Sequence, residues 1–357
     1  MRHSQAVLDF LLPTDEQMPE PMQPRAGPFH DPASHLVSRN GVTMDKLIYA
    51  IVLSWNNYPD TRECIESIRM SSYPITQVVL VDNASNAGFI EQLQGDYADD
   101  AAVHIIRNEA NYGFARGVNV GIQYALARGA DFVFLLNNDA IIDRQCIQVL
   151  VSTLEADATA GIAGPRIFYH ADPDRIWQGS GYFSLIKSGV VNLEKNRLQT
   201  SLAEGIQGIQ KASFLTGCAM LIRSRIFAKV GLFDEDFFFY DEDVDFCLRV
   251  TRAGFKLLYV PQAKSWHKIR NVAKDRTSPF VMYHLARSHL LVLRKNFSVV
   301  YFAYGLLVHL LLYTPYRMLQ IAQGSRSLSA AKAWIKGTWD GISGNGPGIL
   351  PEALFLR

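Results

Sequence analysis

The sequence has little cysteine and almost no net charge, and both shortages exclude classes of protein. Its 357 residues include only four cysteines, which are Cys64, Cys146, Cys218 and Cys247. They lie far apart and form no Cys-x-x-Cys pair, so they indicate neither a zinc site nor a disulfide framework, and a reducing cytosol suits them best. Lys and Arg total 35 against 34 Asp and Glu, so the chain lacks the basic field that attracts nucleic acid. We therefore expect no nucleic-acid partner.

The first residues also lack the features of a secretory signal and of a folded segment. The N-terminus has no basic start followed by an apolar core, so we expect no signal for secretion. Residues 1–45 contain the stretch LLPTDEQMPEPMQPRAGPFHDP, which is rich in proline and acid and has no sustained hydrophobic period. Such a composition buries too little apolar surface to offset the entropy lost on ordering. We therefore predict a disordered N-terminal tail over residues 1–45.

From residue 46 onward, apolar runs alternate with segments of helical spacing. The runs KLIYAIVLSW, ITQVVLVDN, AVHIIRN and ADFVFLLNNDA are bounded by polar residues, which is typical of strands covered on both faces. Between them, PDTRECIESIRMSSY and GFARGVNVGIQYALARG carry apolar residues at helical spacing. This alternation predicts an α/β fold with a mostly parallel sheet and covering helices. In such sheets, ligands bind beyond the carboxyl ends of the strands.

Each of these four predicted strands ends in polar side chains. They are Asn56 and Asn57, Asp82 and Asn83, Asn108, and Asn137, Asn138 and Asp139. One polar strand end would be ordinary, because loops are polar. Four such ends at one sheet edge are better explained by a ligand crevice.

The stretch FFFYDEDVDF places a cluster of carboxylates directly after four aromatic residues. The carboxylates are Asp241, Glu242, Asp243 and Asp245. An acidic helix N-terminus is one interpretation, since carboxylates suit the positive end of a helix dipole. The other is a semi-buried acid with a shifted pKa, as general acid–base catalysis requires. The second interpretation also accounts for the preceding aromatics, because an apolar environment raises the pKa of a carboxyl group.

A histidine near another predicted strand end is a candidate ligand. His267 follows the predicted strand KLLYVP, within the segment AKSWHK. A lone histidine is more often structural, yet this position favours a ligand or phosphate contact. Hard divalent cations prefer oxygen ligands, which Asp139 would supply. His267 would add a nitrogen, which Mn²⁺ accepts better than Mg²⁺ does.

Three glycines, Gly113, Gly117 and Gly121, recur at four-residue spacing within NYGFARGVNVGIQYA. The spacing is not that of a GxGxxG fingerprint. Close packing of a helix against its neighbours is one explanation. The other is a loop and helix start that let Asn111 and Arg116 reach a nucleotide diphosphate.

Residues 296–316, NFSVVYFAYGLLVHLLLYTPY, contain no Asp, Glu, Lys or Arg. As one helix this segment would be about 31 Å long, close to the thickness of the hydrocarbon core of a bilayer. A spanning helix, an in-plane helix at a membrane surface and a buried core helix all fit this length, but His309 and Pro315 weigh against a span. We favour the in-plane helix. The flanking cations that suit anionic headgroups are Arg294, Lys295 and Arg317.

Seven segments together resemble family 2 glycosyltransferases, in particular the rhamnosyltransferase-like branch of bacterial cell-surface polysaccharide assembly. They are IVLSWNN, VVLVDNAS, NYGFARGVNVG, FLLNNDA, FLTGCAMLIR, GLFDEDFFFYDEDVDFCLR and AKSWHK, in that order. The resemblance covers about residues 48–290, and YHLARSHLLVLRKNF and KAWIKGTWDGISG resemble that branch's C-terminal extension. It implies an α/β GT-A fold, with a Rossmann-like mixed, mostly parallel sheet and flanking helices. The implied domains are a GT-A domain over residues 46–290 and a helical extension over 291–357, associated with the membrane.

On the donor side, the resemblance implies contacts with a nucleotide-diphosphate sugar. Asp82 resembles the residue that contacts the nucleobase or ribose, and its neighbour Asn83 is a further candidate. Asn111 and Arg116 would lie near the nucleotide and the sugar. The donor favoured by the resemblance is dTDP-rhamnose, with a UDP-sugar as the alternative.

The segment Asn137-Asn138-Asp139 stands where this family has its DxD motif. Asp139 would bind a divalent cation, Mg²⁺ or Mn²⁺, and Asn137 and Asn138 would lie beside the ribose or the metal. His267 resembles the later histidine that binds the metal or the diphosphate. The first aspartate of the motif is replaced by Asn137, which lowers the negative charge at the metal.

The resemblance also assigns the reaction. Asp243 resembles the catalytic base of an inverting transfer, with Glu242 as its neighbour, and the acceptor would be a lipid-linked or cell-surface glycan, such as a polyprenyl-linked one. The enzyme would work in the cytoplasm at the inner face of the cell membrane. A nucleotidyltransferase would need a phosphate loop rich in Gly, Lys and Arg where SWNNYPDTRE stands. A catalytically weak protein of the same fold that binds glycans or nucleotide sugars remains the alternative, favoured by Asn137 and disfavoured by the intact acids and histidine.

Overall fold

The computed structural model describes residues 46–199, 208–269 and 277–344. They belong to one compact unit, residues 45–357. The tail predicted over residues 1–45 lies outside the described residues.

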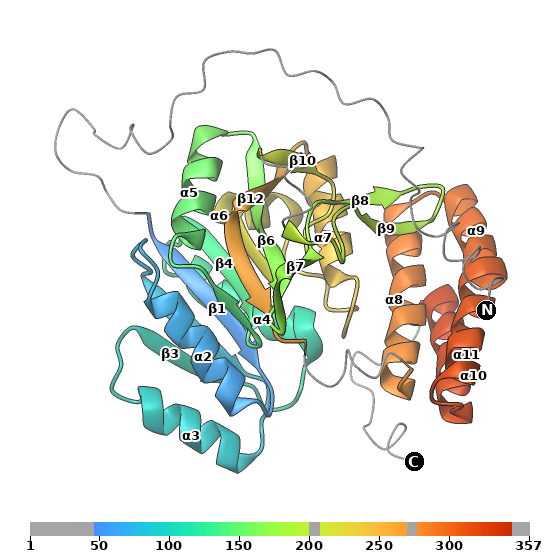
Figure 1. Cartoon of the computed structure of the whole chain (residues 1–357), viewed down its shortest axis with the longest axis horizontal. Helices are drawn as coiled ribbons and strands as arrows, with labels where there is room; N and C mark the ends of the chain where they lie inside the picture. The colour runs from blue at the N-terminus through green and yellow to red at the C-terminus, as the bar shows by residue number, and fades with distance from the viewer. Residues whose placement is uncertain (1–45, 200–207, 270–276, 345–357) are drawn as a thin grey trace. The chain divides into compact units, whose positions relative to one another are not determined.

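A ten-stranded mixed sheet forms the centre of this unit (Figure 1). In spatial order its strands are β10 (Gln210–Ala212), β12 (Lys256–His267), β6 (Ala160–Tyr169), β11 (Ala219–Arg223), β4 (Phe132–Asn137), β1 (Ile48–Ser54), β2 (Gln77–Asp82) and β3 (Val103–Arg107), with β5 (Ala140–Ile142) paired to β12 and β7 (Asp172–Gln178) paired to β6. The four strands β4, β1, β2 and β3 run parallel, whereas β11 runs antiparallel to β4 and β6. The predicted mostly parallel sheet is therefore confirmed. A separate hairpin pairs β8 (Gly181–Ser184) with β9 (Gly189–Asn192).

Helices cover both faces of the sheet, as the continuous apolar runs predict. They are α2 (Tyr58–Arg69), α3 (Ala87–Tyr97), α4 (Gly113–Leu126), α5 (Cys146–Ala156), α6 (Ser224–Val230) and α7 (Glu242–Arg252). Along β1, Ala50 and Val52 belong to the core layer under α2, α3 and α5. Ile51, between them, belongs to the layer under α4, α6 and α7. Successive side chains of a strand point to opposite faces, so a strand buried on both sides must be apolar throughout.

The strand that carries His267 is longer than its sequence predicts. The predicted strand KLLYVP ends at Pro261, a residue that cannot donate a ladder hydrogen bond. Instead β12 runs on to His267, with a register shift against β6 between Val260 and Lys264. This bulge accommodates the proline and lets the strand continue. His267 thus remains at a strand end, but at the end of a strand that also pairs with β5.

The three glycines of the α4 segment serve two different purposes. A Cβ atom would lie 2.7 Å from a β1 side chain at Gly117 and 2.6 Å from one at Gly121. These two glycines therefore let α4 pack closely on the sheet. Gly113 has a left-handed backbone with φ +73, and its Cβ would lie 2.3 Å from the carbonyl oxygen of Phe238. The neighbouring amide of Phe114 donates to that same carbonyl at 2.8 Å. Gly113 therefore fixes the start of α4 against the segment that precedes α7.

The C-terminal part is helical, as predicted, and occupies the right side of Figure 1. It consists of α8 (Pro279–Asn296), α9 (Val299–Val308), a π-helical turn η4 (His309–Tyr313), α10 (Thr314–Gln323) and α11 (Leu328–Ser343). The segments α9, η4 and α10 form one helix of 25 residues, long and apolar enough to cross a membrane, and only 17% of its most apolar window is buried. The buried core helix is therefore the one alternative that the structure contradicts. The predicted domain boundary after residue 290 falls inside α8 and stays a prediction about domain organisation.

Replacing Gly113 with alanine should destabilise the protein far more than the same change at Gly129. Both glycines have left-handed backbones, with φ +73 and +76, but a Cβ at Gly129 meets nothing within 4 Å. Gly129→Ala should therefore cost only the left-handed strain, about 1 kcal/mol. Gly113→Ala adds a backbone clash and should cost at least about 3 kcal/mol in urea unfolding. Equal losses for the two variants would show that α4 does not depend on this contact.

Candidate active site

Side chains that are far apart in the sequence meet at the carboxyl edge of the parallel strands. Ser54 at the end of β1 pairs in register with Asp82 of β2, and Leu53 of β1 pairs with Asn137 of β4. On the other side, His267 pairs with Ala140 in β5. The ends of β1, β2, β4 and β12 thus form one edge, as the sequence predicts for parallel strands.

Asp139 and His267 form a close pair at this edge. His267 Nε2 lies 3.0 Å from Asp139 Oδ1, and the amide of Lys268 donates to the Asp139 carbonyl at 2.8 Å. Burial lowers the pKa of His267, but the Cys218 thiol and the Asp139 carboxylate beside it outweigh this effect and raise the pKa to about 10. The imidazole is therefore protonated at neutral pH. Its buried Nδ1 has no hydrogen-bond partner among the described residues.

Asp243 lies on a second wall that a short loop joins to the first. The amide of Gly217 donates to Asp243 Oδ2 at 2.9 Å, and the amide of Val244 donates to Oδ1 at 2.8 Å. The next residue of the loop, Cys218, accepts a 2.8 Å hydrogen bond from the amide of Asn137 at the end of β4. Burial raises the pKa of Asp243, and the amides of Gly217 and Val244 oppose that rise. The loop at residues 216–218 therefore holds the base candidate at a fixed place relative to the metal candidate.

Both interpretations of the acidic cluster describe part of it. Glu242, Asp243 and Asp245 occupy the first turn of α7, as an acidic helix N-terminus would. Burial and the neighbouring Asp243 also raise the pKa of Glu242 well above its usual range, and burial together with Asp243 raises that of Asp241 to about 7. The buried Oε2 of Glu242 has no hydrogen-bond partner among the described residues. A cluster of several acids here carries less negative charge than its composition suggests.

Backbone strain gathers around the same edge. The non-glycine residues with left-handed backbones include Asn56 and Ala84, which follow β1 and β2, Tyr240 and Asp241 before α7, and Ile269 after β12. Each such residue costs roughly 1 to 3 kcal/mol and persists only where the surrounding structure holds it. Strain of this kind is concentrated at functional sites.

On the donor side, Asp82 is fully buried at the end of β2. Its carboxylate accepts from the amide of Ser85 at 3.2 Å, and Arg107 Nε lies 3.6 Å away. A carboxylate offers about four acceptor positions, so capacity remains for a ligand.

The side-chain amide of the neighbouring Asn83 is hydrogen-bonded to other residues of the protein. Its Nδ2 donates to Asn111 Oδ1 at 2.8 Å and to the Gly113 carbonyl at 3.1 Å. Its Oδ1 accepts from Asn108 Nδ2 at 3.0 Å and from the Tyr112 amide at 3.1 Å. Asn83 therefore ties the ends of β2 and β3 to the loop before α4, and it holds Asn111 in place.

The remaining donor candidates are less fixed. The Arg116 guanidinium lies 3.8 Å from the centre of the Tyr112 ring and 3.8 Å from Glu235 Oε2, and both charged side chains are about half exposed. Asn138 donates to Thr61 Oγ1 of α2 at 2.9 Å, and Asn137 is half-buried.

Two side chains that sequence reasoning missed contact the Asp139–His267 pair or its neighbours. The Trp177 ring meets the His267 ring edge-on, with centroids 4.3 Å apart. Lys268 Nζ donates to Asp60 Oδ1 at 2.8 Å and also to Glu63, which joins the end of β12 to α2. Trp177 stands in an irregular, Gly-rich stretch that gives no signal of this contact. For Lys268, the sequence did offer a signal, because this residue directly follows His267.

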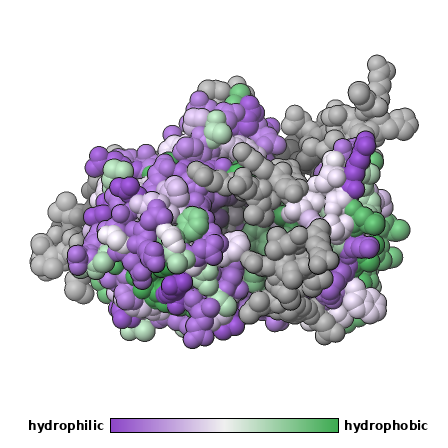
Figure 2. Space-filling model, turned by 90° about the horizontal axis from the view of Figure 1, so that it is seen from below, coloured by the Kyte–Doolittle hydropathy of each residue, from purple (hydrophilic) through white to green (hydrophobic). Residues whose placement is uncertain are grey.

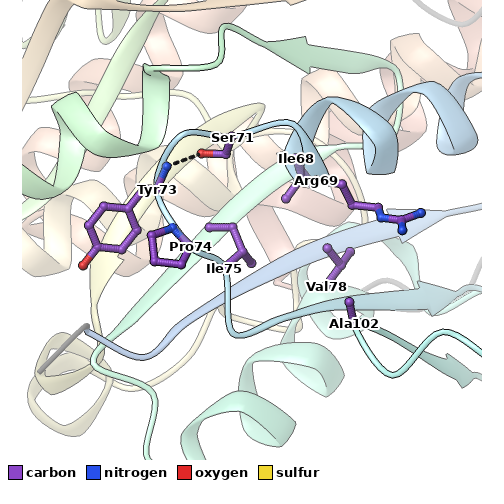
Figure 3. A pocket seen from close by; sticks show the side chains of 8 residues that line it. All are labelled: Ile68, Arg69, Ser71, Tyr73, Pro74, Ile75, Val78 and Ala102. Carbon is purple, nitrogen blue, oxygen red and sulfur yellow. Dashed lines mark hydrogen bonds between the residues drawn. The ribbon is translucent and has the colours of Figure 1, made fainter.

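A cavity at the amino edge of the sheet lies away from these residues (Figure 3). It has a volume of about 190 Å³ and is lined by the end of α2, by Tyr73, Pro74 and Ile75, and by Val78 at the start of β2. This is the amino edge of the sheet, opposite to the acids and His267. The cavity carries no carboxylate or histidine and therefore offers no chemistry of its own.

Comparisons with known proteins relate the chain to glycosyltransferases. Residues 49–231, about half of the chain, match the family model described as glycosyl transferase family 2. The chain is 29% identical to the dTDP-rhamnosyl transferase RfbF of Shigella flexneri over 84% of this chain and 97% of that protein. It is 27% identical to the N-acetylglucosaminyl-diphospho-decaprenol L-rhamnosyltransferase of Mycobacterium tuberculosis, strain H37Rv, over 68% of this chain and 82% of that protein.

Solved structures show the same fold at low sequence identity. GalNAc-T7, solved with UDP, GalNAc and Mn²⁺, is 16% identical with a TM-score of 0.55, over 70% of this chain and 48% of that one. The mannosyltransferase PcManGT of Pyrobaculum calidifontis, solved with GDP-Man and Mn²⁺, is 14% identical with a TM-score of 0.52, over 84% of this chain and 88% of that one. The predicted GT-A fold is thereby confirmed.

Asn83→Ala should destabilise the protein more than Asn138→Ala does. The first change removes four hydrogen bonds and leaves buried partners unpaired, at a cost of about 2 to 4 kcal/mol in the free energy of unfolding. The second removes one hydrogen bond from a half-buried side chain and should cost about 1 kcal/mol or less. Urea denaturation of the two variants measures the difference. A loss at Asn83 no larger than that at Asn138 would contradict its bridging role.

Proposed function

This chain belongs to glycosyl transferase family 2, and we propose that it moves a sugar from a nucleotide-diphosphate donor to a lipid-linked or cell-surface glycan with inversion. Rhamnose carried by dTDP is the favoured donor, with a UDP-sugar as the alternative. The activities of the two relatives, a dTDP-rhamnosyl transferase and a decaprenol-linked rhamnosyltransferase, support rhamnose and a polyprenyl-linked acceptor. The observation that carries the proposal is the loop at residues 216–218, which joins Asn137, two residues before Asp139, to Asp243.

Donor binding is assigned to the side of β1, β2 and α4. The buried Asp82 carboxylate would accept hydrogen bonds from the nucleobase or ribose, since its bond to Ser85 leaves acceptor capacity. Arg116, half exposed over the Tyr112 ring, would turn towards the diphosphate, where a guanidinium can bind two oxygens at once. Asn83 would act by holding Asn111 near the donor, because its own amide is already engaged.

The Asp139–His267 pair fits a divalent cation. Asp139 would supply a carboxylate oxygen and His267 an imidazole nitrogen to the metal, and these two atoms already lie 3.0 Å apart. One oxygen and one nitrogen suit Mn²⁺ better than Mg²⁺. No group of three or more His, Cys, Asp or Glu side chains that could hold a metal occurs among the described residues. The diphosphate and water would therefore complete the coordination, as hard cations at phosphate sites prefer, and Asn137 and Asn138 would lie beside them.

Asp243 is the proposed base of a single displacement. The acceptor hydroxyl oxygen would form a bond to the anomeric carbon while its proton passes to the Asp243 carboxylate. The bond from that carbon to the diphosphate oxygen breaks on the opposite face, which inverts the anomeric configuration. A bound divalent cation would neutralise the charge that develops on the leaving diphosphate. The raised pKa of Glu242 favours its neutral form, which would limit the negative charge beside the base.

We also propose that the enzyme works in the cytoplasm at the inner face of the cell membrane. The helix Val299–Gln323 is apolar and mostly exposed, yet Gly305, His309 and Ile321 on its other side are buried. His309 Nε2 lies 3.0 Å from Thr338 Oγ1 of α11. A helix held along one side by its own domain fits an in-plane position better than a span.

A catalytically weak protein that binds nucleotide sugars or glycans is the second candidate. The observation that favours it is Asn137, which stands in place of a carboxylate beside Asp139. It predicts donor binding without turnover in the unaltered protein.

Asp243→Asn should lower kcat about 10²- to 10⁴-fold while the donor Kd stays within about threefold, because a general base contributes that much to the rate. Glu242→Gln should keep kcat within about threefold, since glutamine has the shape of the neutral acid that the raised pKa of Glu242 favours. Transfer from dTDP-rhamnose and UDP-hexoses measures kcat, and calorimetry measures Kd. Full turnover by Asp243→Asn would exclude Asp243 as the base. A wild-type protein that binds donor without turnover would favour the second candidate.

Mn²⁺ affinity should rise with pH. The His267 pKa of about 10 means that the imidazole is protonated from pH 6 to 8, and a bound metal requires it neutral, so each metal ion that binds releases one proton. The apparent affinity should therefore rise up to about tenfold per pH unit in this range. Calorimetric titration of the wild type measures it, and His267→Asn is the control, expected to bind more weakly and with a flatter pH dependence. An affinity of the wild type that does not change with pH would contradict the assignment of His267 as a ligand.

A further inference from the structure

Three tyrosines of the apolar C-terminal helix hold the turn of the β8–β9 hairpin. The hydroxyls of Tyr301, Tyr304 and Tyr313 donate to three successive carbonyls of that turn, each at 2.7 Å. The accepting residues are Leu185, Ile186 and Lys187. In Figure 1 the hairpin extends from the sheet to α8 and α9. The hairpin and the helix therefore form one structural unit, although they are more than 100 residues apart in the sequence.

The side chains at the turn are apolar and uncovered. Leu185 is 56% exposed and Ile186 is 81% exposed. On the helix beside them, Val299 is 84% exposed and Leu307 and Leu311 are also exposed. Figure 2 shows hydrophobic residues gathered on this side of the molecule, over the C-terminal helices. Exposed apolar patches of this kind mark contacts with another phase or another molecule.

The hydrogen bonds of the turn suit a place with little water. The carbonyls of a turn at the tip of a hairpin normally accept hydrogen bonds from water. In an apolar environment, a carbonyl without a hydrogen-bond partner is energetically costly. Here the tyrosine hydroxyls satisfy the three carbonyls from within the protein. Tyrosine is also the residue type that collects at the boundary between lipid and water. The tip can therefore leave bulk water without leaving these carbonyls unpaired.

The charge around this patch suits an anionic surface. The described residues 277–344 contain seven Lys or Arg and one carboxylate, Asp340. The whole chain carries a net charge of only +1, so the positive charge is concentrated in this part. Juxtamembrane cations are attracted to the anionic lipids of the cytoplasmic leaflet. A lipid bilayer with anionic headgroups fits both the apolar patch and its charge.

We propose that the turn of the β8–β9 hairpin and the exposed face of α9 and η4 insert together into the interface of an anionic bilayer. We call this combined face the docking surface, and its main apolar side chains are Leu185, Ile186, Val299, Val300, Leu307 and Leu311. The inference rests on the proposed function, which places the acceptor in or on that membrane. It adds a second insertion element, from the middle of the chain, to the C-terminal helix.

The docking surface is joined directly to the wall that carries the proposed base. At the end of the hairpin away from its turn, the amide of Phe183 donates to Ser213 Oγ at 3.1 Å. The amide of Phe214 donates to the Gly181 carbonyl, also at 3.1 Å. Phe214 stands two residues before the loop at residues 216–218, which holds Asp243. Insertion of the turn would therefore set the height and direction of the acceptor side of the site relative to the lipid headgroups.

Vesicle flotation of the full-length protein tests the proposal. Vesicles of phosphatidylcholine mixed with phosphatidylglycerol are compared with vesicles of phosphatidylcholine alone, for the wild type and for Leu185→Glu/Ile186→Glu. The matched control is Met70→Glu, because Met70 is equally apolar and 59% exposed but lies at the end of α2. The wild type and Met70→Glu should bind the anionic vesicles, and the hairpin variant should bind at least tenfold more weakly. Solution hydrolysis of the donor, measured in parallel, should be equal in all three proteins.

The outcomes separate this inference from the proposed function. Unchanged vesicle binding by the hairpin variant would overturn the inference while leaving membrane association intact. Absence of vesicle binding by the wild type, with donor hydrolysis retained, would overturn the membrane placement and leave the transferase. A wild type that elutes as a dimer, with the hairpin variant a monomer, would assign the docking surface to a second copy of the chain and overturn the inference. Binding of the wild type to anionic vesicles, weakened only by the hairpin change, would support it.

Discussion

Two hydrogen bonds of consecutive loop residues hold the two walls of the site together. Cys218 accepts from the amide of Asn137 at the end of β4, and Gly217 donates to the carboxylate of Asp243 at the start of α7. Hydrogen bonds tolerate only a few tenths of an ångström, so this loop holds the end of β4 at Asn137, two residues before Asp139, at a fixed separation from Asp243. Because β11 begins directly after the loop and pairs with β4, the sheet itself maintains that separation. A transfer reaction needs this, since small displacements of reacting groups cost large factors in rate.

The C-terminal helices support the same wall, so they are more than an addition to the catalytic fold. Arg287 of α8 donates to the Asp236 carbonyl at 2.7 Å, and Ser288 donates to the Phe239 carbonyl at 3.0 Å. Both acceptors belong to the segment that carries the strained Tyr240 and Asp241. Strained backbone persists only where neighbours hold it, and here α8 does so from one side while Gly113 of α4 approaches from the other. The helix α8, which packs against α9, is thereby connected to the proposed base.

Much of the fold could be predicted because its signals are local. The four parallel strands are short apolar runs, and each places its polar end at one edge, so their sequence reveals both the strands and the candidate site. Contacts made across long stretches of chain gave no such signal. The side-chain amide of Asn83 bonds to residues 25 to 30 positions away, a bridging role that the local sequence does not indicate. The continuation of β12 past Pro261 depends on a bulge, and the tyrosine contacts with the hairpin turn depend on how two distant segments pack.

The neutral side chain at position 137 fits the charge balance of the site. A protonated His267 beside the Asp139 carboxylate gives a pair without net charge. A second carboxylate at position 137 would add a negative charge next to that pair, where burial makes an unpaired charge costly. Asn137 keeps the backbone bond to Cys218 and avoids this cost. If a divalent cation binds as proposed, His267 gives up its proton, and the site gains one unit of positive charge instead of two. Loss of the His267 proton would then offset part of the charge of the metal. In a site with two aspartates, the second carboxylate would offset that charge.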